Sequence, residues 1–380
     1  MTSRLRNPFK PTAGATPPLL VGRGDVLEEF TESLEDGPGA PMRLVRFTGA
    51  RGVGKTVMLT EVADVASRRG WAVISDTATP GLAARLAATV AQSLTKRGIE
   101  RTRSDQPVDI APVSDAPQST SRSALAPQAA VDFRANLGLL LNDLEAHDSG
   151  LLITVDEVHS TGLADLRELA PVFQHLTREK RDIALAMAGL PSAVSDLLND
   201  HVLTFLRRAV PVELADVPLT DVREAFTASF AAAGRQIEGQ ALDIATAATG
   251  GYPFMIQLVG YHVWRCADGE GVSADAAERG ATAARKRLGS TVHETSMADL
   301  SGVDRTYLVA MAQDDGPSST GTIARRLNET PQYAGVYRQR LIDAGMIEAV
   351  DHGKVDFAIP YLREYLREHA ARYEMESRTT

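Results

Sequence analysis

The sequence predicts an α/β protein in which a parallel sheet flanked by helices is followed by a helical lid and a C-terminal winged helix-turn-helix domain. Three observations predict this order. A Gly-rich loop follows an apolar stretch near residue 49, apolar strands alternate with helical stretches up to residue 216, and three helix candidates precede a hairpin after residue 300. With 380 residues, the chain is expected to form two or three domains.

Composition limits the classes of function. The hydrophobic content of 44% and the charged content of 23% are typical of a soluble globular protein, and no apolar run reaches the roughly 18 residues of a membrane helix. The start, MTSRLRNPFKPTAGATPP, is basic and Pro-rich, so residues 1–18 are expected to be a disordered tail rather than a signal peptide. The single cysteine, Cys266, fits a cytoplasmic protein without internal disulfides.

The strongest motif is GARGVGKT at residues 49–56, which matches the phosphate-binding P-loop pattern G-x-x-x-x-G-K-[ST] between a strand candidate and a helix candidate. Its glycines let successive N–H groups point at phosphates, and the helix N-terminus adds a positive dipole end. Lys55 is expected to reach the β- and γ-phosphates, with a catalytic role, and the Thr56 hydroxyl is expected to bind Mg²⁺. A Gly-rich turn without ligand is the disfavoured alternative. The expected ATP- or ADP-binding residues of this segment are Gly49, Ala50, Arg51, Gly52, Val53, Gly54, Lys55, Thr56 and Val57.

A second acidic strand completes the motif. The run GLLITVDEVHS is apolar up to Val155, as in a strand buried on both faces of a parallel sheet, and then reaches two carboxylates. Asp156 is expected to hold Mg²⁺, and Glu157 is expected to polarise the attacking water. His159 is interpreted as a polar neighbour, not as a catalyst.

Further strands are expected at 71–76, 182–189 and 209–215, and helices at 82–97, 128–147 and 163–178. This alternation predicts a parallel sheet with the nucleotide at the carboxyl ends of its strands. Prolines, serines and charges fill residues 99–128, which are expected to be a disordered insertion. A tolerated surface loop is the favoured interpretation of this insertion over a partner-binding element.

The segment PPLLVGRGDVLEEFTESLEDG, upstream of the P-loop, resembles the entry motif of the AAA+ and STAND ATPases related to origin-recognition initiators. The resemblance implies that Val21, Gly22 and Arg23 lie beside the adenine or its ribose. A local helix start at Gly24 and Asp25 would explain the same residues without a ligand.

Two further matches extend the resemblance. The segment from Gly189 to Phe226 is similar to the region in which an arginine before the fifth strand reaches a neighbouring subunit's nucleotide, and Arg207 or Arg208 occupies that place. Solvated helix-end arginines are an equally good interpretation. The Gly-Gly-Tyr-Pro run resembles the Gly-x-Pro motif of STAND lids, which implies that Pro253 lies near the adenine; a Pro at the first helical position also needs no ligand.

The sequence departs from the initiator pattern at two places. Initiators usually carry a polar residue at the end of the fourth strand and an arginine in the lid helix, both of which sense the γ-phosphate. Here Ala188-Gly189 and the run from Gly251 to Phe254 stand in those places. Slow or partner-dependent hydrolysis, and hence a nucleotide switch, is therefore expected.

These patterns divide the chain into an ATPase domain at 19–216, a helical lid at 217–298 and a winged-helix domain at 299–375. The last is predicted by helix candidates within DRTYLVAMAQD, STGTIARRLN and TPQYAGVYRQRLIDAG, followed by a hairpin and a final helix. The third helix is expected to start at Thr330 with Pro331 and to end at Gly345. Its Val336, Leu341 and Ile342 are expected to be core residues.

The target of the winged helix stays open between two hypotheses. A DNA-binding version would present Gln332, Tyr333, Arg338 and Arg340 to the major groove, with Lys354 on the wing. However, residues 301–380 hold ten basic and twelve acidic side chains, whereas a dedicated DNA-binding module is usually basic. The net charge of −9 likewise argues against indiscriminate nucleic-acid binding.

The sequence therefore predicts an ATP-binding switch that uses Mg²⁺ and is a candidate ATPase. In one version its nucleotide state controls binding to double-stranded DNA. In the alternative, the winged helix contacts its own core, another copy of the chain or a protein partner, as in STAND signalling switches. The absence of clustered cysteine and histidine ligands leaves the magnesium-nucleotide site as the expected metal site.

Overall fold

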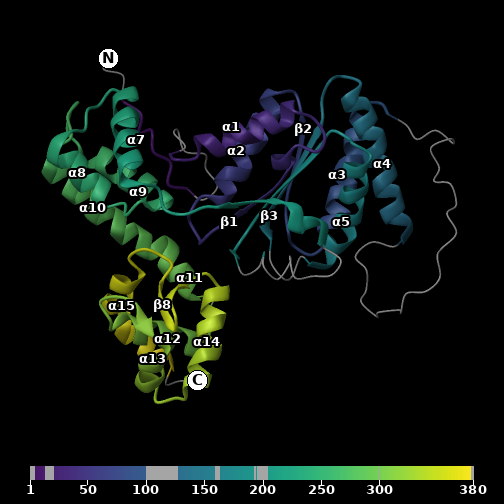
Figure 1. The fold of residues 1–380 in the computed structure, drawn as a ribbon. Helices are drawn as coiled ribbons and strands as arrows, with labels where there is room; N and C mark the ends of the chain where they lie inside the picture. The colour runs from purple at the N-terminus through teal and green to yellow at the C-terminus, as the bar shows by residue number, and fades with distance from the viewer. Residues whose placement is uncertain are drawn as a thin grey trace.

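The computed structural model describes residues 5–12, 21–99, 127–158, 163–191, 194, 204–298 and 300–377. Most of the expected disordered insertion and His159 lie outside this part of the chain. Within it, no helix is long and apolar enough to cross a membrane. Figure 1 shows a sheet flanked by helices, a helical lid beside it and a smaller C-terminal domain below the lid.

The central sheet has five strands in the order β2-β3-β4-β1-β5, and all of its neighbours are parallel. The order confirms the predicted parallel α/β fold, in which the first strand lies between strands that come later in the sequence. The strands are β1 (Leu44–Thr48), β2 (Ala72–Thr77), β3 (Leu151–Val158), β4 (Ile183–Gly189) and β5 (Val210–Glu213).

Helices cover both faces of this sheet because alternate side chains of its strands point to opposite faces. In β3, Leu152 packs into the core beneath the helices on one face, whereas Leu151 and Ile153 pack into the core on the other. The first face is covered by α1 (Gly24–Glu35) and α2 (Lys55–Arg68), and the second by α3 (Leu82–Lys96), α4 (Pro127–Glu145) and α5 (Leu163–Arg178).

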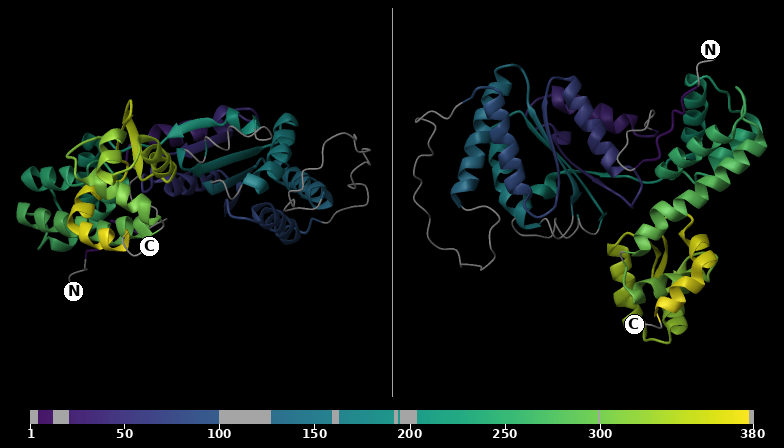
Figure 2. Two further views of the ribbon diagram at one scale, coloured as in Figure 1. Left: turned by 90° about the horizontal axis from the view of Figure 1, so that it is seen from below. Right: turned by 180° about the vertical axis from the view of Figure 1, so that it is seen from behind.

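The lid is a bundle of helices that shares a hydrophobic core with the first face of the sheet. It comprises α7 (Leu219–Ala232), α8 (Gly239–Ala247), α9 (Pro253–Cys266) and α10 (Ala274–Leu288). The last of these continues through a π-helical turn, η5 (Gly289–His293), into α11 (Glu294–Ala298). Figure 2 shows this continuous helix, here called the connecting helix, running from the lid to the C-terminal domain.

The C-terminal domain has the helix and strand order of a winged helix-turn-helix. Its elements are α12 (Gly302–Ala312), β6 (Ser318–Ser319), α13 (Thr320–Leu327), α14 (Pro331–Asp343), β7 (Ile347–Asp351), β8 (Lys354–Phe357) and α15 (Leu362–Ser377). The three strands form an antiparallel sheet in the order β6-β8-β7. As predicted, the Thr330 side chain caps α14 by accepting a bond from the Tyr333 N–H, and Pro331 is its first residue.

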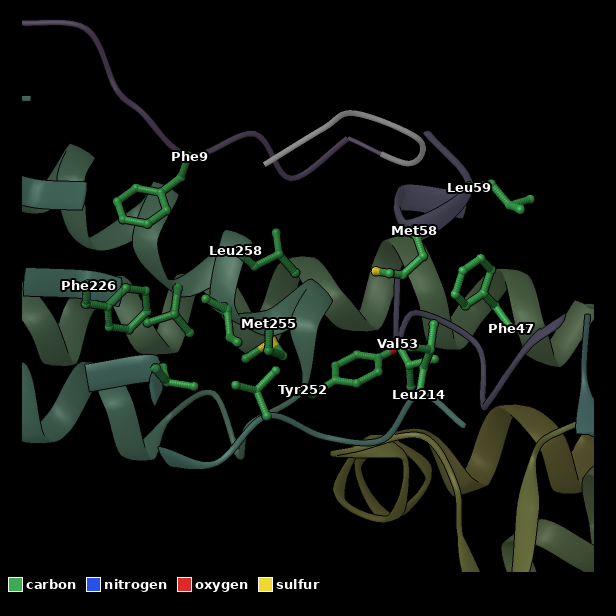
Figure 3. Packing of buried hydrophobic residues seen from close by; sticks show 14 of the residues in the cluster. Phe9, Phe47, Val53, Met58, Leu59, Leu214, Phe226, Tyr252, Met255 and Leu258 are labelled. Atoms are coloured by element: carbon green, nitrogen blue, oxygen red, sulfur yellow. The ribbon is translucent and has the colours of Figure 1, made fainter. Parts of the chain in front are cut away.

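Two expectations about single segments are wrong. Val336 on α14 is 60% exposed, not a core residue, because it faces away from the domain core that Leu341 enters. Residues 5–12 of the expected disordered tail are placed on the lid: Phe9 is only 2% exposed and packs against Phe226 (Figure 3) and against Phe230.

Candidate functional site

The P-loop joins β1 to α2 at the carboxyl end of the sheet. Gly54, at φ +96°, precedes the first helical residue, Lys55. The Lys55 ammonium group donates to the carbonyl oxygens of Gly49 (2.9 Å) and Ala50 (2.7 Å) within the same loop. Burial lowers the pKa of Lys55, although the negative charges of Glu157 and Asp156 oppose this shift. Phosphate oxygens are stronger partners for an ammonium group than carbonyl oxygens. Lys55 is therefore placed to exchange its two carbonyl partners for phosphate oxygens.

The acidic strand end lies directly beside the P-loop. The Thr56 hydroxyl donates to Asp156 Oδ2 at 2.6 Å, which brings together two oxygen ligands from separate elements. A hydroxyl and a carboxylate are the ligand types that Mg²⁺ prefers, so this pair fits the ion that P-loop ATPases use. The register of β3 against β4 shifts between Val155 and Val158, and Glu157 has φ +52°. A residue other than glycine in this left-handed region is strained, as is common at functional sites.

A cavity of about 690 Å³ opens between the sheet domain, the lid and the connecting helix. Glu157 is the one acidic side chain among the described residues that line it. The basic side chains that line it are Lys10, Arg23, Arg51, Lys55 and Arg287. This excess of positive charge, in a cavity of the size that holds small ligands, favours a polyanionic occupant.

Backbone contacts join the P-loop to residues 214–218, which connect β5 of the sheet to α7 of the lid and are here called the hinge. The Leu214 N–H donates to Thr48 O (2.7 Å), and a Cβ added at Gly49 would lie 2.4 Å from Leu214 O. Further along the hinge, the Val217 N–H donates to Gly251 O (2.8 Å), at the turn that precedes α9. The hinge therefore touches the P-loop at one end and the lid turn at the other.

Tyr252, from this lid turn, reaches into the P-loop. Its hydroxyl donates to the carbonyl oxygen of Arg51 at 2.8 Å, and its ring points toward Val53 and Leu214 (Figure 3). Burial raises the pKa of Tyr252 well above its usual value, so it stays a neutral donor. Tyr252 is not among the predicted site residues, because Gly-Gly-Tyr-Pro marks a helix start without showing what the tyrosine contacts.

The family described as the AAA ATPase domain matches residues 19–187. This part of the chain is an AAA ATPase domain. A family described as a domain of unknown function matches residues 290–366. A comparison with curated proteins gave no significant match.

Solved structures resemble the AAA ATPase domain together with the lid and the C-terminal domain. The Walker-type ATPase of Pyrococcus abyssi is 15% identical, with a TM-score of 0.64 over 92% of this chain and 96% of that chain. The ADP form of the Aeropyrum pernix ORC2 protein is 15% identical, with a TM-score of 0.53 over 97% of this chain and 99% of that chain. At these identities the likeness shows a shared fold.

Most of the residues that were predicted to bind the nucleotide lie together at the cavity. Val21, Arg23 and Pro253 line it together with Glu157 and the P-loop residues from Arg51 to Val57. Gly22, Gly49 and Ala50 belong to the adjoining backbone but do not line the cavity. Arg23 also donates to Ala215 O at 2.5 Å, while α1 begins at Gly24 without a side-chain cap, so the arginine contacts the hinge as well as the cavity.

The arginines predicted to reach a neighbouring subunit's nucleotide do not line this chain's own cavity. Arg207 and Arg208 are exposed at the end of η4 (Thr204–Arg208), before β5, and neither lines the cavity. Conversely, Arg287 in the last turn of α10 lines the cavity, whereas a lid arginine was expected only near Gly251 to Phe254. The basic run RKRL was the signal that could have drawn attention to Arg287.

The residues predicted to contact DNA differ in their surroundings. Arg340 forms an ion pair with the buried Asp304 (3.0 Å), and Arg338 is half-buried, with its Nε enclosed and without a hydrogen-bond partner. Lys354, at the start of β8, is exposed. The exposed side of α14 instead carries Val336, between Tyr333 and Tyr337, whose rings lie 4.9 Å apart.

Proposed function

We propose that the chain is an ATP-dependent switch that binds ATP with Mg²⁺ between the sheet domain and the lid and hydrolyses it slowly. The observation that carries this proposal is the shared cavity. Lys55 of the P-loop, Tyr252 of the lid and Thr291 of the connecting helix all line it. A nucleotide in this cavity touches three parts of the fold, so the presence or loss of its γ-phosphate changes how these parts are arranged.

The proposed roles follow from the side chains. Lys55 exchanges its two carbonyl partners for phosphate oxygens and stabilises the charge that develops on them. Thr56 and Asp156 hold Mg²⁺, which when bound neutralises phosphate charge. Glu157 lines the cavity, where it accepts a hydrogen bond from the attacking water and orients it. Arg207 or Arg208 acts on the nucleotide of a second copy, which its exposed position allows.

The connecting helix is the proposed route from the nucleotide to the C-terminal domain. Thr291, Val292 and Thr295 line the cavity on one side of the helix. On the other side, His293 Nε2 lies 2.9 Å from Pro360 O, just before α15, the last helix of the C-terminal domain. A shift of this helix would therefore move the C-terminal domain.

Contacts of the C-terminal domain favour intramolecular or protein binding over DNA binding. The Tyr361 hydroxyl donates to Ala248 O of the lid (2.8 Å), and a Cβ added at Gly345 would lie 3.1 Å from Leu190 Cδ2 of the sheet domain. Arg340, a predicted DNA contact, forms an ion pair with Asp304, and the partly buried pair Tyr333 and Tyr337 lies on α14. We therefore propose protein contact as the favoured role, with DNA binding as the second candidate.

Two measurements test this function. Sedimentation with ADP and with a slowly hydrolysed ATP analogue should give different coefficients; identical coefficients in both would exclude a nucleotide-driven change of shape or assembly. Gel shifts of double-stranded DNA over a salt series, with ATP present, test the DNA version. Binding with a steep salt slope that Lys354→Ala reduces would favour DNA, whereas no shift at low salt favours protein contact.

A further inference from the structure

The N-terminal segment at residues 5–12 lies along the lid. Phe9 fills a pocket among lid helices, with its ring centroid 5.7 Å from that of Phe226 and 5.2 Å from that of Phe230. A Cβ added at Gly260 would lie 2.4 Å from the Phe9 ring, so α9 has room for this ring only because residue 260 is glycine. The lid core is therefore built around a side chain that lies outside the lid in sequence.

Polar contacts fix the backbone on both sides of Phe9. The Asn7 side chain donates from Nδ2 to Tyr261 O (3.1 Å) and accepts from the Phe9 N–H (3.0 Å). Next, the Lys10 N–H donates to Gln257 Oε1 (3.1 Å). All of these partners outside the segment belong to α9, the helix whose first turn carries Pro253 at the cavity.

The segment then enters the wall of the cavity. Lys10, Pro11 and Thr12 line it beside Gln257. In the described part of the chain, Lys10 is exposed and forms no ion pair with a carboxylate, while four other basic side chains line the same cavity. A fifth cation in this place is repelled by the others unless an anion binds among them.

We propose that residues 5–12 are a strap that completes the nucleotide site, with Phe9 as its anchor and Lys10 as a cation that binds the polyphosphate of the nucleotide. The inference rests on the proposed ATP-binding function and names an additional binding residue for it. The strap adds to the P-loop because it lies on the lid and lines the same cavity. It thus favours the lid position in which Lys10 reaches the bound phosphates.

Isothermal titration of the full chain with Mg²⁺-ATP and with adenosine tests the role of Lys10. Lys10→Ala should weaken ATP binding about three- to fivefold, as for an exposed ion pair, and leave adenosine binding unchanged. Lys10→Arg should keep the parent affinity. Lys286→Ala, which removes an exposed lysine of α10 that does not line the cavity, is the matched control and should bind ATP as the parent does. Equal ATP affinity for Lys10→Ala and the parent would overturn this role.

Hydrogen exchange tests the strap in the parent protein, in which no substitution alters the fold. In the parent protein, Mg²⁺-ATP should slow exchange of the Phe9 and Lys10 amides, whereas Lys10→Ala should reduce this protection while its melting temperature without nucleotide stays at the parent value. Phe9→Ala should abolish the protection, and Phe9→Leu should retain most of it. Exchange at residues 5–12 that ATP does not change would contradict the strap.

Lys55→Ala separates the two possible failures. If the parent binds ATP, Lys55→Ala binds it about 10- to 100-fold more weakly, and Lys10→Ala binds it as the parent does, the strap is wrong and the ATP site stands. If the parent binds no ATP, both proposals are wrong.

Discussion

The Tyr252 hydroxyl donates a 2.8 Å hydrogen bond to the carbonyl oxygen of Arg51, which joins the lid turn before α9 to the middle of the P-loop. The contact is close: a Cβ added at Gly52 would lie 1.8 Å from the same hydroxyl. The P-loop glycine thus serves two needs, a left-handed backbone at φ +78° and space for the tyrosine. Any movement of the lid away from the sheet must break this bond.

Tyr252→Phe should lower the free energy of unfolding by about 1 kcal/mol, because the part-buried Arg51 carbonyl loses its donor while the ring still packs. Tyr333→Phe, on the surface of α14, should change it by less than about 0.5 kcal/mol. Urea unfolding measures both. Equal effects of the two substitutions would show that the contact with Arg51 does not stabilise the fold.

Gly52→Ala should be more harmful than Gly54→Ala, although both glycines have positive φ. At Gly54 the nearest atom to an added Cβ is 4.0 Å away, so the cost is about 1–2 kcal/mol of backbone strain. At Gly52 the clash with Tyr252 adds a further 1–3 kcal/mol or forces the lid to open. Gly52→Ala combined with Tyr252→Ala should recover part of this difference in thermal unfolding. Indistinguishable melting temperatures for the two single variants would contradict the contact.

The P-loop, the acidic strand and the parallel α/β fold could be predicted because each depends on local pattern. Lys55 and Thr56 belong to a motif of fixed spacing, and the apolar run before Asp156 marks a buried strand. The burial of Phe9 could not be predicted, since it depends on Phe226 and Phe230, more than two hundred residues away, and its own segment has no periodicity.

Other features depend on tertiary context in the same way. The left-handed conformation of Glu157 arises at an irregularity between β3 and β4, which the alternation of apolar residues does not reveal. Arg340 looked available for DNA because its partner, Asp304, lies on another helix of the domain. Val336 was expected in the core because it is apolar, yet helix geometry turns it outward.

His293 should make the protein less stable in acid. It is 1% exposed, and burial lowers its pKa from 6.5 to about 4. When neutral, His293 can donate a hydrogen bond from Nε2 to Pro360 O. Its Nδ1 has no hydrogen-bond partner, so a proton bound there would have no acceptor. Because the unfolded chain takes up the proton first, the stabilisation is complete above pH 6.5 and declines by about 3 kcal/mol as the pH falls to about 4.

Urea unfolding between pH 7 and pH 4 measures this effect. Part of the loss should disappear in His293→Gln, which cannot be protonated. His352→Gln, in the exposed turn of the wing, should keep the slope of the parent protein. The same slope in all three proteins would show that His293 is not the group responsible.

Glu157→Gln should retain ATP binding and lose hydrolysis by about 10²-fold or more, because an amide cannot accept the proton of the attacking water. Glu213→Gln, at the end of β5 and outside the cavity lining, should hydrolyse ATP at the parent rate. Phosphate release at saturating ATP measures both rates. A Glu157→Gln variant with the parent rate would assign the role of general base to another group.

The most direct test of the account is equilibrium binding of Mg²⁺-ATP to the parent chain and to Lys55→Ala. The parent should bind, and Lys55→Ala should lose about 10- to 100-fold in affinity, as expected when charged hydrogen bonds worth about 1.5–3 kcal/mol are removed. Lys96→Ala, an exposed lysine at the end of α3, should bind as the parent does. Equal affinity in the parent and in Lys55→Ala, or no binding by the parent, would contradict the assignment of this cavity as the ATP site.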